Sequence, residues 1–371
     1  MDYDTLLLDD NRRSMFPGCE PRILSVSSDH TMRQWNVKTG EEQRLFWRHK
    51  AAVLCLSVDW NSGLAVTGSG DHTLALWDIQ SEKDPLRTFF QGHKDWVTSV
   101  DVDWENRRML SGAADGELRL WSMDDSGAAV SMHEHQKAVC AVAADWKSQV
   151  AISAGHDQTI RVWDLETQQC TCRMDGHTGP VWCASLDPEG GQKAVTGSSD
   201  RHLMVWDVRT KSCVRAMLQH NRHVVDLRVD WSTFQGMSCS TDRTLVLWDL
   251  QEAEPLQKYN RHPGSVFCMD VDWRGRRMVT GAGPGDNSML VWDFEDGYVE
   301  SEIQGHEGSV WAVAVDWETA HKALEASKGI GLEPQEEMDE DVSPSKSIGR
   351  SASEASALGR KKRWVKRRVR R

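Results

Sequence analysis

The residue types of a hydrolase triad, a Ser or Thr, a His and an Asp, occur together repeatedly along this chain. They keep a fixed spacing to a Trp: the Asp lies six residues before it, the hydroxyl residue ten or twelve before it, and the His 14 or 16 after it. The Trp residues are Trp35, Trp77, Trp121, Trp163, Trp206, Trp248 and Trp292, and the Asp residues are Asp29, Asp71, Asp115, Asp157, Asp200, Asp242 and Asp286. The hydroxyl residues are Ser25, Thr67, Ser111, Ser153, Thr196, Ser238 and Thr280, and the His residues are His49, His93, His135, His177, His220, His262 and His306. An active site needs one nucleophile, so seven copies favour a structural role over catalysis.

The elements that must position these residues are short strands. Successive Trp residues of the set lie 42 to 44 residues apart, which indicates a repeat array. Between them stand alternating runs such as "AVLCLSVDW", "LAVTGSG" and "TLALWDI", separated by Gly, Asp, Asn and Ser. Such runs predict β-strands joined by tight turns. Each unit is therefore expected to form a small antiparallel sheet.

Units that begin with Gly-His and end with Trp-Asp resemble the WD-repeat family. The resemblance covers residues 22–317 and implies an all-β fold, a seven-bladed WD-repeat β-propeller. In that family the four markers form a buried relay in which the Asp holds the His, the His meets the hydroxyl, and the hydroxyl accepts from the indole N–H. Carried over to two units, this structural relay comprises His93, Ser111, Asp115 and Trp121, and His306, Ser25, Asp29 and Trp35.

The two ends of the repeat array complement each other. The first unit has the hairpin "RILSVSSDHTMRQWNV" but no Gly-His before it, whereas the last unit, "GHEGSVWAVAVDW", has no hairpin after it. We expect the N- and C-terminal strands to pair in one blade and close the ring, which removes exposed strand edges. The segment "TLLLDDNRR" could instead supply the inner strand of the first blade, but it contains no His.

An Asp-Trp pair after the expected inner strand departs from the usual polar turn of the family. The six Trp residues are Trp60, Trp104, Trp146, Trp231, Trp273 and Trp317, and Pro188 takes the seventh place. Six exposed aromatic side chains would be costly. We favour packing between blades over a second binding surface, because aromatic residues bury large areas.

Composition limits the class of protein. The chain has a net charge of −12 and nine Cys without a Cys-x-x-Cys pair, and its hydrophobic runs are too short to cross a bilayer. We therefore expect a soluble intracellular protein, cytoplasmic and/or nuclear. The chain from Glu318 onward is net basic, so the preceding body is strongly acidic and should repel nucleic acid.

The chain ends have a different composition. We expect residues 1–21 to be an N-terminal extension and 318–371 to be a disordered tail, rich in Ser and acidic residues. The tail ends in "RKKRWVKRRVRR", which resembles a nuclear-import signal or a site for nucleic acid or anionic lipid, and could also contact the acidic body. Ser343 and Ser353 stand in short patterns typical of phosphorylation sites.

The resemblance also implies a binding surface at the mouth of the central channel. The residues that flank the first Val of each inner strand, together with the residue before a turn Asp, crowd there in WD-repeat propellers. The predicted partner-binding residues are Trp96, Thr98, Cys140, His156, Trp182, His223, Val225, Phe267 and Trp311. Aromatic anchors dominate protein interfaces, and the acidic body favours a partner with Lys or Arg, as an extended peptide or disordered segment.

Two functions fit these observations. The first is a non-catalytic scaffold that binds partner proteins or peptides within a larger complex, without a cofactor, a metal or a small-molecule substrate. The alternative is a substrate receptor of a cullin-type ubiquitin ligase, which would dock its adaptor through the motif Trp206-Asp207-Val208-Arg209. An enzyme is not expected, because the sequence shows no catalytic site or phosphate-binding loop.

Overall fold

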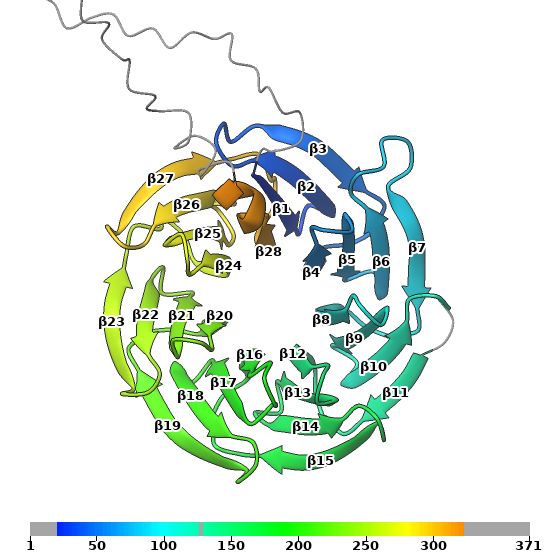
Figure 1. Ribbon diagram of the computed structural model, residues 1–371, viewed down its shortest axis with the longest axis vertical. Coiled ribbons are helices and arrows are strands. Elements are labelled where there is room, and N and C mark those ends of the chain that lie inside the picture. Colours follow the sequence, from blue (N-terminus) through cyan, green and yellow to red (C-terminus); the bar gives the residue numbers. More distant parts are fainter. Residues whose placement is uncertain (1–20, 126–128, 323–371) are drawn as a thin grey trace, which may run out of the picture. The chain divides into compact units, whose positions relative to one another are not determined.

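The repeat units form a ring of blades. The computed structural model describes residues 21–125 and 129–322, and within these ranges seven four-stranded antiparallel sheets surround a common axis (Figure 1). This confirms the all-β, seven-bladed propeller. None of the helical residues in the two described ranges belongs to a helix long and apolar enough to span a membrane.

The four strands of each blade follow one another from the axis outward. Blade 1 consists of β28 (Val310–Val315), β1 (Arg22–Ser27), β2 (Thr31–Asn36) and β3 (Glu42–Trp47). Blade 2 consists of β4 (Val53–Asp59), β5 (Leu64–Ser69), β6 (Thr73–Asp78) and β7 (Leu86–Gln91). Blade 3 consists of β8 (Val97–Asp103), β9 (Arg108–Ala113), β10 (Glu117–Ser122) and β11 (Ala129–His133). Blade 4 consists of β12 (Val139–Asp145), β13 (Val150–Gly155), β14 (Ile160–Asp164) and β15 (Gln169–Met174).

The remaining blades repeat this order. Blade 5 consists of β16 (Val181–Leu186), β17 (Lys193–Ser198), β18 (His202–Asp207) and β19 (Ser212–Leu218). Blade 6 consists of β20 (Val224–Asp230), β21 (Gln235–Ser240), β22 (Leu245–Asp249) and β23 (Glu254–Tyr259). Blade 7 consists of β24 (Val266–Asp272), β25 (Arg277–Ala282), β26 (Met289–Asp293) and β27 (Tyr298–Ile303).

The core lies between neighbouring blades. The second strands are almost wholly buried, as in β13, whereas outer strands such as β19 bury a single residue. Blades approach closely where the second strand carries a Gly: a Cβ on Gly112 would lie 2.6 Å from Val139 of the next blade, and one on Gly281 would lie 2.8 Å from Val310. A side chain at either position would push two blades apart.

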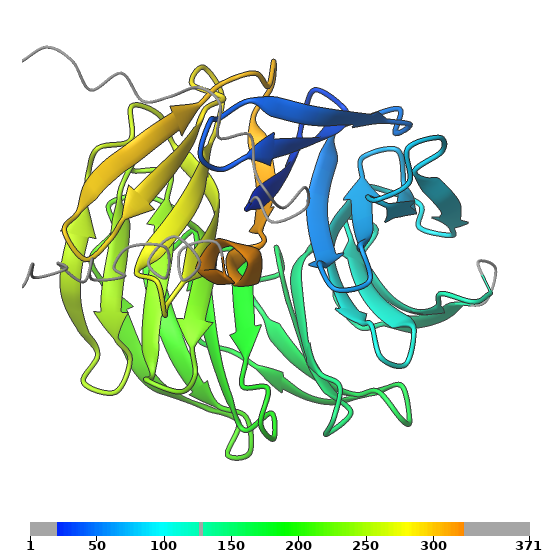
Figure 2. The same cartoon turned by 45° about the horizontal axis from the view of Figure 1, so that its top comes forward.

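The ring closes through the two ends of the array. β28 pairs antiparallel with β1, with Ile23 opposite Val315 and Leu24 opposite Ala314 (Figure 2). The side chains of Arg22 and Asp316 form an ion pair of 3.2 Å at the end of this pairing. The expected closure is therefore confirmed. β28, and not the alternative segment "TLLLDDNRR", forms the inner strand of blade 1. That alternative segment lies outside the described residues.

Side chains from one blade satisfy the inner-strand edge of the next. The N–H groups of Ala144, Met269 and Val315 donate to the carboxylates of Asp101, Asp226 and Asp270, at 3.0, 2.8 and 2.8 Å. Each of these carboxylates belongs to the preceding inner strand. One N–H on the free edge of each of these three inner strands is therefore bonded, and the bonds also fix blades 4, 7 and 1 against the preceding blades.

The six Trp residues of the Asp-Trp pairs are half-buried, and each packs against one of the core clusters between blades. Three of them also donate their indole N–H across a blade boundary: Trp146 to Asp101 at 2.9 Å, Trp317 to Asp270 at 3.2 Å and Trp231 to Ser185 at 3.3 Å. This placement agrees with the packing interpretation of these residues.

The chain continues beyond β28 as a short helical segment, residues 317–322, in which His321 lies 3.0 Å from the Asp272 carboxylate. The first residues of the expected disordered tail are thus helical. The rest of that tail, with Ser343, Ser353 and the basic end, lies outside the described residues, as does nearly all of the N-terminal extension.

Closure predicts a sharp difference between two truncations. A chain ending at Gly305 lacks β28 and leaves the β1 edge open, so it should lose cooperative unfolding in a thermal melt. A chain ending at Lys322 keeps β28 and the helical segment, and should melt within a few degrees of the intact protein. Equal melting of both would contradict the role assigned to β28.

Candidate functional site

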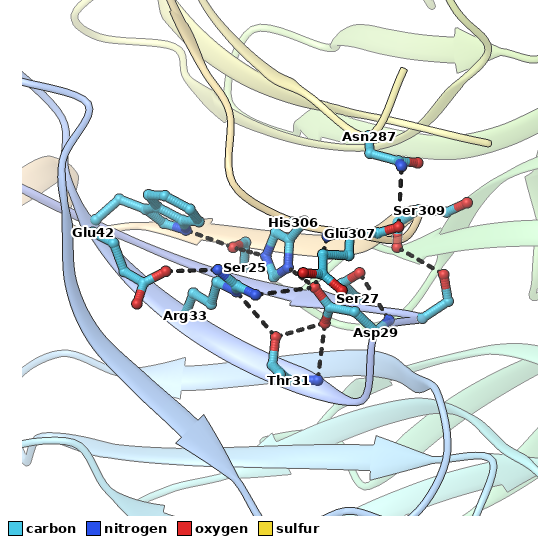
Figure 3. A network of polar contacts seen from close by, with 12 residues as sticks. Ser25, Ser27, Asp29, Thr31, Arg33, Glu42, Asn287, His306, Glu307 and Ser309 are labelled. Atoms are coloured by element: carbon cyan, nitrogen blue, oxygen red, sulfur yellow. Dashed lines mark hydrogen bonds and ion pairs between the residues drawn. The ribbon is translucent and has the colours of Figure 1, made fainter. Parts of the chain in front are cut away.

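The Ser or Thr, His, Asp and Trp markers meet in every blade. In blade 1, His306 from the end of the chain lies 2.7 Å from the Ser25 hydroxyl and 2.8 Å from the Asp29 carboxylate (Figure 3). The indole N–H of Trp35 donates to the Ser25 hydroxyl at 2.7 Å. Because a carboxylate only accepts, Nδ1 of the neutral His donates to Asp29, and Nε2 accepts from the hydroxyl.

The same geometry recurs around the ring. In blade 3, His93 lies 2.7 Å from the Ser111 hydroxyl and 3.0 Å from Asp115, and Trp121 donates to Ser111 at 2.9 Å. In the other five blades, the equivalent contacts of the His and the Trp with the hydroxyl lie between 2.6 and 2.8 Å. The structure thus brings together all eight residues predicted for the two example relays.

Each relay Asp is also held by the backbone. Burial alone would raise the pKa of Asp115, but hydrogen bonds from His93 and from the N–H groups of Lys94 and Glu117 lower it to about 2. The Asp therefore stays ionised and fixes the turn between the second and third strands onto the loop that carries the His. This contact sets the shape of the loops at one end of the ring.

Glycine before the His has a steric cause. A Cβ on Gly305 would lie 2.7 Å from the Trp35 ring, and one on Gly176 would lie 2.9 Å from the Trp206 ring. Gly305 also has a φ of 152°, within the range that favours Gly. The Gly-His marker therefore reflects the close packing of the relay Trp.

The relay in blade 7 is incomplete. Nδ1 of His262 lies 3.8 Å from the Asp286 carboxylate and has no hydrogen-bond partner among the described residues. In the other blades the residue after the His donates its N–H to the Asp, but here that residue is Pro263, and Gly264 donates to Asp286 instead, at 3.0 Å. Pro lacks the N–H that would draw the Asp onto the ring.

The relays are built for stability. The relay hydroxyl residues are 0% exposed, and the His93 side chain is 0% exposed, so a substrate has no access to the hydroxyl. Each hydroxyl is already occupied by the His and the indole N–H. A buried and saturated hydroxyl is a poor nucleophile, in agreement with the structural interpretation of these residues.

We call the end of the ring that carries the relay loops and the turns holding the relay Asp residues the relay face. Four of the predicted partner-binding residues lie there in contacts between blades. The ring of Trp182 packs 4.8 Å from that of His156 at the preceding blade's turn, and the rings of Phe267 and Trp311 lie 4.9 Å apart. Trp182 also donates its N–H to the Ser199 hydroxyl at 2.7 Å.

Exposure differs among the predicted residues. Trp96 is 54% exposed and Trp311 36% exposed, while Trp182 and Phe267 are half-buried. The Trp96 ring lies against Gly70 of the preceding blade, where a Cβ would be 3.5 Å away. His223 is also exposed and approaches the Ser199 carbonyl at 3.3 Å. These side chains are held in place and partly open to a partner.

Three other predicted residues have internal contacts. The Thr98 hydroxyl donates to the Val139 carbonyl at 2.6 Å and is close to that of Gly112, so it ties two blades together. Val225 packs against a core cluster. Burial raises the pKa of the Cys140 thiol to about 12, so this thiol stays protonated. None of the three is fully exposed.

The sequence analysis missed the polar part of the relay face. A pocket of about 390 Å³ lies beside blade 2, and its lining includes Arg48, Lys50, His72, Phe89 and Gln91. Every unit except that of blade 7 places a Lys, Arg or His one or two positions after the relay His, or directly after the relay Asp. This spacing is visible in the sequence, but the net negative charge of the body pointed to a basic partner instead.

The ligase-docking motif is mostly structural. Trp206 is 0% exposed and donates to the Thr196 hydroxyl at 2.8 Å, while the Asp207 carboxylate accepts from the Thr210 N–H at 2.8 Å. Arg209 is exposed. Only one residue of the motif is therefore free to dock an adaptor.

Comparison with known proteins agrees with this geometry. The model of the WD domain, G-beta repeat family matches residues 40–78, 83–122, 129–164, 168–207 and 253–293, which together exceed half of the 371 residues. The chain therefore belongs to the WD-repeat family.

Curated relatives match a smaller part of the chain. Eukaryotic translation initiation factor 3 subunit I of Drosophila pseudoobscura pseudoobscura and that of Drosophila grimshawi are each 40% identical over 58 residues, which is 16% of this chain and 18% of the relative. The same subunit of Drosophila melanogaster is 38% identical over 58 residues. The chain spans less than a fifth of the length of these relatives. The 58 matched residues correspond to about one and a half repeats, so the match indicates a shared type of repeat.

Removing a relay His should lower stability without affecting binding directly. His93→Ala removes one hydrogen-bond partner from each of the Ser111 and Asp115 side chains and should reduce the free energy of unfolding by roughly 1 to 3 kcal/mol. Denaturant unfolding followed by Trp fluorescence measures this change. A loss of partner binding at unchanged stability would show that His93 faces a ligand instead.

The incomplete relay predicts a pH effect. Burial lowers the pKa of His262 to about 4, so this side chain is neutral in the folded protein but takes up a proton in the unfolded chain below its ordinary value of about 6.5. Unfolding therefore binds a proton between these pH values, and stability falls as pH decreases through them. His262→Gln should flatten the pH dependence of the melting temperature between pH 6.5 and 4.5; an unchanged slope would contradict this assignment.

Proposed function

We propose that this chain is a non-catalytic scaffold that binds partner proteins at the relay face. The WD-repeat family is generally a family of protein-interaction modules, and the partial likeness to a translation initiation factor subunit fits a protein that works within a larger assembly. More specifically, we propose that the predicted partner-binding residues around the mouth of the central channel form the contact.

The observation that carries this proposal is the exposure of aromatic rings on a rigid support. Trp96 is 54% exposed although it rests on Gly70, and Trp311 is 36% exposed although it packs on Phe267. Exposed Trp side chains are costly in water, and Trp is among the residues that contribute most to interface affinity. Because the blades fix these rings beforehand, little conformational entropy is lost when a partner binds.

The ligase-receptor alternative has no specific support. Two of its four motif residues, Trp206 and Asp207, already serve the fold, and the motif lies at the opposite end of β18 from the relay face. We therefore propose only the scaffold function. Cytoplasmic and/or nuclear location stays part of the proposal, and its sequence basis, the basic run at 360–371, lies outside the described residues.

Alanine substitutions test the proposed surface. Trp96→Ala and Trp311→Ala should each weaken partner binding by about 2 kcal/mol or more, which is roughly a 30-fold change, because they remove exposed anchors. Pull-down from cell extract with mass spectrometry, with melting checked for each variant, measures the effect.

Tyr298→Ala is the matched control, since Tyr298 is an exposed aromatic residue, 42% exposed, at the start of the outer strand β27 and away from the relay loops. It should leave the partner set unchanged. If the control loses partners and both relay-face variants retain them, the proposed surface is wrong.

A further inference from the structure

The exposed charged residues of the relay loops that form no ion pair among the described residues are mainly cationic. Cationic residues stand in the loops next to the relay His and directly after the relay Asp, and two anionic residues, Asp95 and Glu307, occupy such positions. The cationic residues are Lys50, Lys94, Lys137, Arg201, Arg222 and Arg243. Lys94 pairs with Glu117 at 3.2 Å. The other five are exposed and form no ion pair with a residue in the described ranges.

The opposite end of the ring is acidic. Its turns between third and fourth strands carry many carboxylates, including Glu82, Asp84, Glu166, Glu295 and Asp296. The net charge of −12 therefore reflects that end of the ring more than the relay face. The expectation of a basic partner rested on the total charge, and this distribution argues against it.

The carboxylates within the relay face are already occupied. Asp71 accepts from the His49 ring and from the Lys50 N–H at 2.9 Å each, and from the Thr73 hydroxyl at 2.6 Å. Glu117 accepts from Lys94 and from Arg119. These carboxylates keep their charge, but other donors hold them and none forms an ion pair with the five exposed Lys and Arg side chains described above. Those cations are therefore available to an external anion.

An apolar contact lies beside the cations. The pocket lined by Arg48, Lys50 and His72 is next to Gly70, and the exposed Trp96 ring rests on Gly70. A single extended segment of a few residues can therefore reach both the indole and the pocket. Trp96 offers an apolar surface and Arg48 and Lys50 offer charge-assisted hydrogen bonds.

We propose that the relay face binds an acidic segment of a partner protein, with an apolar residue on Trp96 and neighbouring carboxylates at Arg48 and Lys50. The proposal rests on the scaffold function and specifies the partner's chemistry. A peptide fits better than a nucleic acid, because the cations occupy one end of an otherwise acidic ring, and a long polyanion would also meet the repelling charges around it.

Fluorescence anisotropy with defined probes tests this inference. The acidic probe is a short labelled peptide of Glu and Asp with two Leu residues; matched probes replace the acids by Gln or by Lys, and a single-stranded oligonucleotide is the fourth probe. The acidic peptide should bind tightest, and its affinity should fall with salt. Tightest binding of the Lys peptide or of the oligonucleotide would overturn the proposal.

Matched variants locate the contact. Arg48→Gln and Lys50→Gln combined should weaken the acidic probe about fivefold, as expected for two exposed ion pairs. The control combines Arg209→Gln and Lys211→Gln, which remove two exposed cations from the opposite end. Equal weakening by both sets would overturn the proposal. Trp96→Ala should weaken the probe with Leu more than one with Ser in place of Leu.

Two further results distinguish this inference from the scaffold function and from binding of the chain's own acidic stretch. If the acidic probe fails to bind while Trp96→Ala still loses cellular partners, the scaffold function stands and the acidic chemistry is wrong. If a chain ending at Lys322 binds the probe and the full chain does not, the chain's own acidic stretch at 333–342 is the occupant, and the proposal of a partner segment is overturned.

Discussion

The hydrogen-bonded relay is the interaction on which the rest of the structure depends. It joins the loop before an inner strand to the turn after the second strand and to a Trp on the third, so it fixes three strands of a blade at one point. In blade 1 it joins residues from both ends of the chain, His306 and Ser25. Because the His, the hydroxyl and the indole are buried, the loss of one member removes a hydrogen bond that water cannot readily replace.

The relay also explains why the relay face can serve as a binding surface. The Asp of each relay holds the loop and the turn together, as the bonds from His93 and Lys94 to Asp115 show. Side chains that project from these loops start from fixed backbone positions. In blade 7, Pro263 removes one such bond and leaves His262 with an unpartnered nitrogen, so a single residue changes how well one unit is held.

Charge separation along the ring axis is the basis of the partner chemistry that we propose for the relay face. The sum of charges describes the far field of the molecule, whereas a partner at the relay face meets the nearby cations Lys50, Arg201 and Arg243. These residues lie next to the relay positions in sequence, and the acids lie after the Trp-Asp pairs. The two sets alternate along the chain, and only the antiparallel return of each strand gathers them at opposite ends.

The number of blades and the relay partners could be predicted from the sequence, because both depend on spacing within one repeat. Matching the two ends of the array favoured closure by β28 and left "TLLLDDNRR" as an alternative, and the pairing of β28 with β1 resolved that choice. The contacts of each predicted partner-binding residue could not be predicted in this way. Thr98 donates to Val139 of the next blade, and Trp96 rests on Gly70 of the preceding one. Such contacts join different repeats, and the pattern within a single repeat does not specify which side chain a neighbouring blade covers.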